Sequence, residues 1–188
     1  ETHRDLNIPG LTRRRVDVWL PEEYHQNPLK RFPVLYVQDG QMVFDQFHNR
    51  GGGWKVHQAI SYLASEGKIT PPIVVAIPST VNRQYEYLPA TAMDFPGGEE
   101  TYESASGGQW TQTQRQMSEQ FTHWLVDLVK PAMDQRYRTF PDMENTALMG
   151  SSLGGIVSLY LFCEYPQVFS KAARSEERRV GKECRSRW

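Results

Sequence analysis

The segment Gly150-Ser151-Ser152-Leu153-Gly154-Gly155 constrains the fold of this chain more than any other. Residues 146–149 before it form a short apolar run typical of a buried strand. Residues 156–162 after it are apolar and lack Gly and Pro, as expected of a buried helix. The segment therefore fits the G-x-S-x-G turn that joins a strand sharply to a helix, where glycines avoid collisions that side chains would cause. This turn would hold the Ser152 hydroxyl exposed at the end of a sheet.

The same turn makes Ser152 a candidate nucleophile. The backbone N–H of Leu153 is then a candidate donor to an oxyanion, because it follows the nucleophile at the start of the helix. Ser151 is the poorer candidate, since its neighbours two places away are Met149 and Leu153 and not glycines. Gly-rich turns also join strands to helices without doing chemistry, so the motif alone leaves a purely structural role open.

Length and composition limit the classes of protein that this chain can belong to. Its 188 residues are enough for one domain with a substantial core. No apolar run approaches the roughly 20 residues of a membrane helix, so no membrane span is expected. The net charge is −1 for the whole chain and −4 without residues 174–188, which hold six basic and three acidic residues, and this mildly acidic body argues against nucleic acid as a partner. The cysteines and histidines lack metal-site spacing, and we expect neither a metal nor another cofactor. The oligomeric state and the compartment stay open.

Residues 174–188 differ abruptly from the rest of the chain. They carry six basic and three acidic residues after an apolar helix. Each of their fifteen codons can be chosen to reproduce a common short-read sequencing adapter. We therefore expect residues 1–173 to form the domain and residues 174–188 to be a non-native tail. A natural basic tail that binds nucleic acid is the alternative.

Strands alternate with helices along residues 13–173. Apolar patterns predict strands at 13–20, 32–37, 73–77 and 146–149, and helices at 54–66, 114–133 and 156–162. This order predicts an α/β protein with a mostly parallel sheet and helices on both faces. Residues 78–109 read as a long polar loop, and the arginines at 13–15 as a solvated strand edge. Ligands of such sheets bind beyond the carboxyl ends of the strands, where residues 38–41 and Ser152 both fall.

Five motifs in this order resemble one branch of a known family. They are Arg15 to Leu20 with Pro21, Phe32-Pro33-Val34-Leu35-Tyr36-Val37-Gln38-Asp39-Gly40-Gln41, Arg83-Gln84-Tyr85-Glu86-Tyr87-Leu88-Pro89, Asp134-Gln135-Arg136-Tyr137-Arg138-Thr139 and Gly150 to Gly155. Together they are similar to the esterase D and enterochelin-esterase-like branch of the α/β-hydrolases, over about residues 13–173. The resemblance implies an α/β-hydrolase fold and a serine esterase that acts on a small-molecule ester.

The resemblance also implies roles for single residues. Ser152 would be the nucleophile, and the backbone N–H groups of Leu153 and Gln41 would form the oxyanion hole. Asp39 would either contact substrate or fix its own turn by Asx-type hydrogen bonds. Arg83 and Glu86 are expected to form an ion pair that braces their loop.

The sequence departs from the family pattern after Ser152. In this fold the triad acid and histidine follow the serine, but the last histidine is His123. Before residue 174, Glu164 is the one acidic residue beyond the serine. We therefore expect a fold that lacks its C-terminal strands and a chain that is inactive as it stands, from a parent serine esterase. An acyltransferase of the same fold and a non-catalytic α/β-hydrolase binding module are the alternatives.

Overall fold

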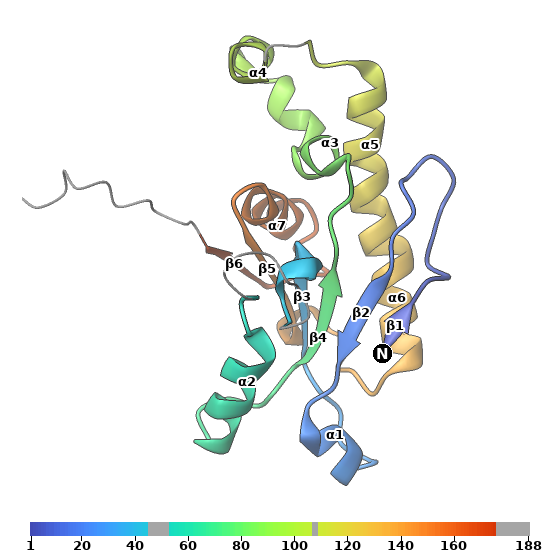
Figure 1. The fold of residues 1–188 in the computed structure, drawn as a ribbon, viewed down its shortest axis with the longest axis vertical. Helices are drawn as coiled ribbons and strands as arrows, with labels where there is room; N and C mark the ends of the chain where they lie inside the picture. Colours follow the sequence, from blue (N-terminus) through green and yellow to red (C-terminus); the bar gives the residue numbers. More distant parts are fainter. Residues whose placement is uncertain (45–52, 107–108, 176–188) are drawn as a thin grey trace, which may run out of the picture.

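A six-stranded sheet organises the computed structural model, which describes residues 1–44, 53–106 and 109–175 (Figure 1). The strand order is β1-β2-β4-β3-β5-β6. Strands β4, β3, β5 and β6 run parallel, whereas β1 and β2 join the sheet antiparallel. The predicted mostly parallel sheet is therefore confirmed. The strands are β1 (Thr2–His3), β2 (Val16–Trp19), β3 (Val34–Gln38), β4 (Ile73–Ile77), β5 (Thr146–Ser151) and β6 (Lys171–Ser175).

Helices cover both faces of this sheet, as predicted. Side chains of α5, η3, α6 and α7 pack with β2, β3 and β4 in the larger core cluster. Helix α2 packs on the opposite face in a smaller cluster. The helical segments are α1 (Glu22–Gln26), η1 (Gly40–Met42), α2 (Val56–Ser65), α3 (Arg83–Tyr87), η2 (Ala90–Met93), α4 (Gly98–Ser106), α5 (Gln112–His123), η3 (Trp124–Val129), α6 (Lys130–Arg136), η4 (Met143–Asn145) and α7 (Leu153–Glu164).

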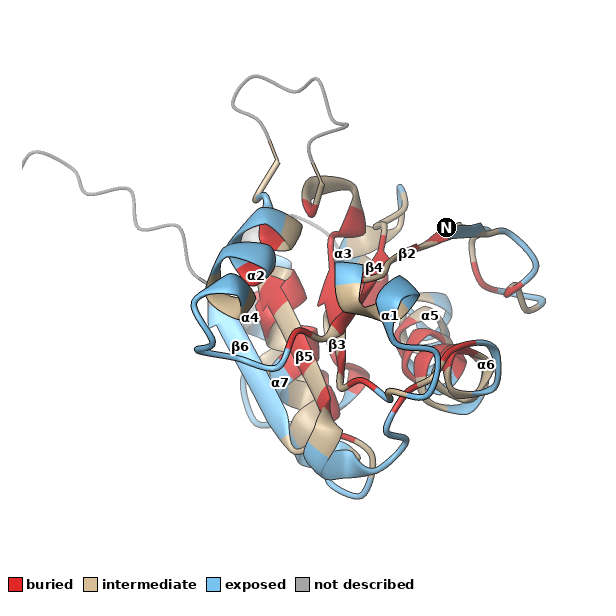
Figure 2. Cartoon of the chain, turned by 90° about the horizontal axis from the view of Figure 1, so that it is seen from below, coloured by how far each residue is buried: buried red, intermediate tan, exposed pale blue. Residues whose placement is uncertain are grey.

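The central strands are the most deeply buried part of the molecule. Every residue of β4 is buried, and β3 is buried except at Leu35 (Figure 2). Parallel strands that are covered on both faces have continuous apolar sequences, and this is why the sequence predicted β3 and β4. Edge strand β6 is exposed at residues 171–174.

The prediction of one long loop at residues 78–109 was wrong. Within the described part of that range, the chain forms α3, η2 and α4. Helices α3 and α4 lie above the carboxyl end of β4 (Figure 1). These elements are short and polar, and contacts to distant residues stabilise them. One example is the hydrogen bond that the Ala90 N–H donates to Ser118 Oγ at 3.2 Å.

The predicted helix at 114–133 is interrupted. Its middle forms the π-helical segment η3, and α6 begins with Pro131 near its first turn. Proline has no N–H to donate to the preceding turn, and a π-turn is one way for a helix to absorb that loss.

The strand at the end of the domain extends past the predicted boundary at Ala173. In β6, Arg174 pairs with Gly150 and Ser175 pairs with Ser151. The remainder of the predicted tail, 176–188, lies outside the described residues. None of the helices in the described ranges has the length and apolar character that a membrane crossing requires.

Candidate active site

Ser152 occupies a strained turn between β5 and α7. Its φ of 54° and ψ of −125° are unfavourable for a residue with a side chain, and it is exposed at the N-cap of α7. A Cβ added to Gly150 would lie 2.2 Å from the carbonyl oxygen of Gly154. Glycine is therefore required at that position of the turn. The sharp strand-to-helix turn predicted from the sequence is present.

The turn after β3 packs directly against the first turn of α7. Strands β3 and β5 are parallel neighbours, with Val37 opposite Met149, so both end at the same edge of the sheet. A Cβ added to Gly154 would lie 2.8 Å from Asp39 Oδ2 and 3.1 Å from the Cβ of Gln38. The structure thus brings the 38–41 turn and the Ser152 turn together, as the topology predicted.

Both predicted oxyanion donors lie in the first turn of a helical segment. Leu153 is the first residue of α7, and Gln41 is the second residue of the 3₁₀ turn η1. N–H groups in the first turn have no carbonyl partner within their own helix, so they can bind an anion. The side chain of Gln41 is held by Ser79, accepting from its N–H at 2.8 Å and donating to its Oγ at 2.7 Å.

The Asp39 carboxylate is bound by Arg83. Arg83 Nε donates to Oδ1 at 2.6 Å and Nη2 donates to Oδ2 at 2.8 Å, and these bonds raise the pKa of Arg83. The Asp39 N–H donates to Tyr87 Oη at 3.2 Å, and burial raises the pKa of that phenol. Asp39 has a φ of 57° and a side chain that is 6% exposed. Its substrate contact stays a prediction. The expected Asx-type role was wrong, because the Asp39 side chain makes no capping hydrogen bond to η1 and accepts from Arg83 of α3.

The expected ion pair between Arg83 and Glu86 was wrong. Arg83 binds Asp39, and Glu86 instead binds Arg14 at 2.5 Å, with both side chains of the second pair buried. Thr80 Oγ1 also donates to Glu86 Oε2 at 2.9 Å. Helix α3 is therefore bound both to the turn after β3 and to the segment that precedes β2, which sequence proximity could not show.

Arg14 also contradicts the expectation of a solvated arginine cluster. Its side chain is 2% exposed and its guanidinium lies over the rings of Phe121 and Trp124, at 5.2 and 5.0 Å from the centroids. The signal was present in the sequence, because strand alternation puts Arg14 on the same face as Val16 and Val18.

The histidines that the structure describes have contacts with residues other than Ser152. His3 Nε2 is hydrogen-bonded to Tyr137 Oη at 2.6 Å, and His123 Nδ1 to Asp127 at 3.0 Å. His57 packs against Trp19 and Phe44, and His25 against Tyr24. His48 lies outside the described residues. The described residues also contain no group of three His, Cys, Asp or Glu side chains that could hold a metal ion.

The sequence of this chain is similar to the sequences of known esterases. The family model described as "Putative esterase" matches residues 11–175. An endo-1,4-β-xylanase/feruloyl esterase of Xylanibacter ruminicola is 28% identical over 160 residues, which are 81% of this chain and 18% of that protein.

Solved structures show the same fold. A ferulic acid esterase from Anaeromyces mucronatus superposes with a TM-score of 0.56 at 24% identity, covering 85% of this chain and 52% of its own. Enterochelin esterase from Shigella flexneri gives a TM-score of 0.58 at 18% identity. The match covers 90% of this chain and 35% of that protein. The α/β-hydrolase fold and the enterochelin-esterase-like resemblance are therefore confirmed. The chain spans about half or less of the length of these proteins.

Proposed function

The chain belongs to the esterase family matched over residues 11–175, and we propose that its parent protein is a serine hydrolase of carboxylic esters. The observation that carries the proposal is the exposed Ser152, held at a φ of 54° and a ψ of −125° on the N-terminus of α7. A backbone in this unfavourable region persists only where its surroundings impose it, and such residues cluster at active sites.

In the proposed mechanism, Ser152 Oγ attacks the carbonyl carbon of the ester. The carbonyl oxygen becomes an oxyanion, which the N–H groups of Leu153 and Gln41 stabilise together with the positive end of the α7 dipole. Collapse of this tetrahedral intermediate expels the alcohol and leaves an acyl group on Ser152. Water then attacks the acyl-enzyme and releases the acid, regenerating the serine hydroxyl.

A general base is needed to take the proton from Ser152, and no histidine follows it in this sequence. Serine is a weak nucleophile at neutral pH unless a base activates it. We therefore propose that residues 1–173 are the N-terminal part of the esterase domain and that the 188-residue chain is inactive alone. The triad acid and histidine would belong to the part of the parent protein beyond this chain.

Two activity measurements test the proposal. The 188-residue chain is expected to give no burst of nitrophenol from p-nitrophenyl acetate, and a Ser152-dependent burst would contradict the proposed inactivity. In the parent protein, Ser152→Ala should reduce kcat/KM for this ester by at least about 10³-fold. Ser151→Ala is the matched control and should keep activity.

Other outcomes would identify the alternatives. A parent protein that forms the acyl-enzyme but releases it only to an added alcohol is an acyltransferase. A parent protein that does not react with a fluorophosphonate at Ser152 is not a serine hydrolase, and the proposal fails.

A further inference from the structure

We propose that a basic hollow beside the loop between β1 and β2 binds a phosphate group, either as the free ion or as part of a small phosphorylated molecule. The hollow has a volume of about 290 Å³, close to the lower end of the range of small-molecule pockets. We call it the arginine hollow, because its lining residues are Arg4, Asn7, Arg13, Arg14 and Arg15. None of these residues is acidic.

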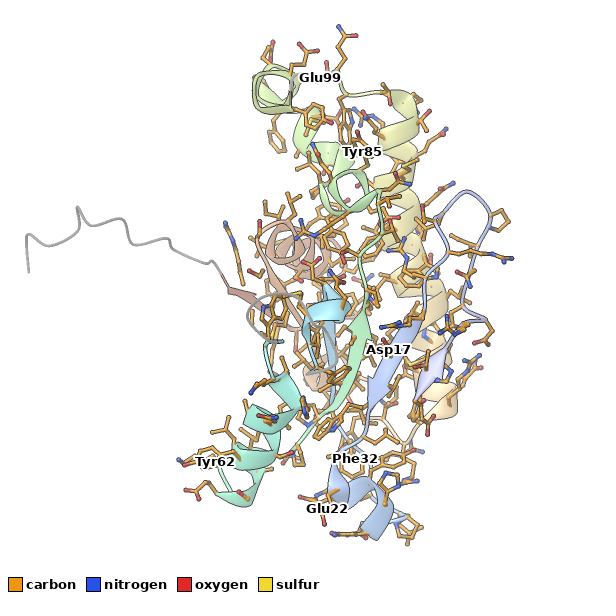
Figure 3. All side chains as sticks on the ribbon, viewed as in Figure 1. Asp17, Glu22, Phe32, Tyr62, Tyr85 and Glu99 are labelled. Carbon is orange, nitrogen blue, oxygen red and sulfur yellow. The ribbon has the colours of Figure 1, made fainter. Side chains whose placement is uncertain are left out.

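The arginine hollow is separate from the turn that carries Ser152. Its lining residues precede β2 in the chain, and β4 and β3 lie between β2 and β5, the strand that leads into the Ser152 turn. Figure 3 shows Asp17 on β2, toward the edge of the sheet opposite β6. Binding in the hollow therefore needs no chemistry at Ser152, and the proposal is independent of the proposed function.

The arginine hollow holds more positive charge than nearby carboxylates offset. Arg14 and Arg15 each bind one carboxylate, at 2.5 and 2.7 Å. Asp5 is bound by an arginine outside the hollow. Arg4 and Arg13 are exposed, and neither makes an ion pair with an acidic residue in the described part of the chain. A phosphate group carries about two negative charges near neutral pH, so its charge matches the two unpaired arginines.

The loop between β1 and β2 is fixed by contacts on both of its sides. Leu6 is buried, and its carbonyl oxygen accepts from Trp124 Nε1 at 2.7 Å. Asn7 joins the two sides of the loop: its Nδ2 donates to the Arg4 carbonyl oxygen at 2.7 Å, and its Oδ1 accepts from the Arg14 N–H at 3.1 Å. The arginines are therefore gathered before a ligand arrives, which lowers the entropic cost of binding.

Arg14 has hydrogen-bond donors that the described residues do not use. Its side chain is 2% exposed, and its Nε and Nη1 have no hydrogen-bond partner among those residues. A buried N–H group without a partner is costly, so an acceptor from outside the chain is favoured. Phosphate oxygens accept from guanidinium N–H groups in strong, charge-assisted bonds. Because Arg14 lines the arginine hollow, we assign these donors to a bound phosphate.

Isothermal titration calorimetry of the 188-residue chain at constant ionic strength tests the assignment. We expect inorganic phosphate to bind with a Kd of about 1 mM or lower, and acetate, which carries a single charge, to bind at least about tenfold more weakly. Arg4→Gln and Arg13→Gln should each weaken phosphate binding at least about fivefold, because each removes an unpaired charge. Arg31→Gln removes an exposed arginine elsewhere and should leave binding unchanged.

A variant that strengthens binding separates the charge effect from loss of structure. Asp17 Oδ2 accepts from Arg15 Nε at 2.7 Å, so Asp17→Asn removes the negative charge beside Arg15. This variant should bind phosphate at least about twofold more tightly. Glucose 6-phosphate distinguishes the two sources of the phosphate group. Tighter binding than that of inorganic phosphate identifies a phosphorylated molecule as the ligand, and equal binding identifies the free ion.

Three results would overturn the assignment: no binding of either phosphate compound, acetate binding as tight as phosphate binding, or full phosphate binding by Arg4→Gln. The last result would place the anion in a neighbouring groove, which Arg13, Arg14 and Arg15 also line and which extends to Gln41 without Arg4. Ser152→Ala should bind phosphate as the unchanged chain does. A parent protein without esterase activity would therefore reject the proposed function and leave the phosphate site standing.

Discussion

Arg83 and Asp39 form a two-bond ion pair that joins α3 to the turn after β3, with donor–acceptor distances of 2.6 and 2.8 Å. Asp39 Oδ2 is also the atom closest to where a side chain on Gly154 would begin, at 2.8 Å. One carboxylate therefore lies where β3, α3 and α7 meet. The pair holds the segment that carries Gln41 in place against the helix that carries Leu153.

Loss of the Asp39 charge should destabilise this junction. We expect Asp39→Asn to lower the free energy of unfolding by about 1–3 kcal/mol, since hydrogen bonds to a charged, buried group are the stronger ones. Urea unfolding measures the change. The matched control is Asp94→Asn, which breaks the two-bond pair with Arg115 at a carboxylate that is 58% exposed. Asp94→Asn should lower the free energy of unfolding by less than about 1 kcal/mol. Equal losses of stability in the two variants would contradict the special role of Asp39.

Removal of one partner from the buried Arg14–Glu86 pair should be more damaging. We expect Glu86→Gln to lower the free energy of unfolding by about 3–5 kcal/mol, because it leaves the buried Arg14 guanidinium without a counter-charge. The double variant Arg14→Met, Glu86→Leu should recover most of that loss, since it buries no charge. Thermal unfolding followed by circular dichroism compares them. A double variant no more stable than Glu86→Gln would show that the loss comes from packing.

The strain at Ser152 should be relieved by glycine. We expect Ser152→Gly to raise the free energy of unfolding by about 1 kcal/mol, because glycine tolerates a φ of 54° without steric cost. Ser152→Ala keeps a Cβ and should give no such gain. Chemical denaturation of the two variants side by side measures the difference, and a glycine variant no more stable than the alanine variant would argue against backbone strain.

The buried amide of Gln38 should be dispensable for stability. Gln38 is fully buried, and neither Nε2 nor Oε1 has a hydrogen-bond partner among the described residues. We expect Gln38→Met to stabilise the protein by about 1 kcal/mol, since it removes an unsatisfied polar group at similar volume. The same substitution at exposed Gln167 should change stability by less than about 0.5 kcal/mol. Destabilisation by Gln38→Met in a thermal melt would indicate that the amide has a partner.

Local patterns identified the elements that are apolar and regular. The runs at β3 and β4 were predicted from the sequence because parallel strands covered on both faces leave little room for polar residues. Segments α3, η2 and α4 were missed because short polar helices have weak signals of their own and depend on tertiary contacts. The interruption at η3 was missed although Pro131 was visible, because the helical pattern continues on both sides of it.

The sequence by itself determined the turn at Ser152, its place between a buried strand and a helix, and the absence of a histidine beyond it. These follow from residue order and from steric limits that act within a few residues. Only the tertiary structure decided the partners of the charged residues: Arg83 binds Asp39, 44 positions away, and Glu86 binds Arg14, 72 positions away. Charge is not specific to one partner, so pairing depends on which groups the packed core brings within a few ångströms of each other.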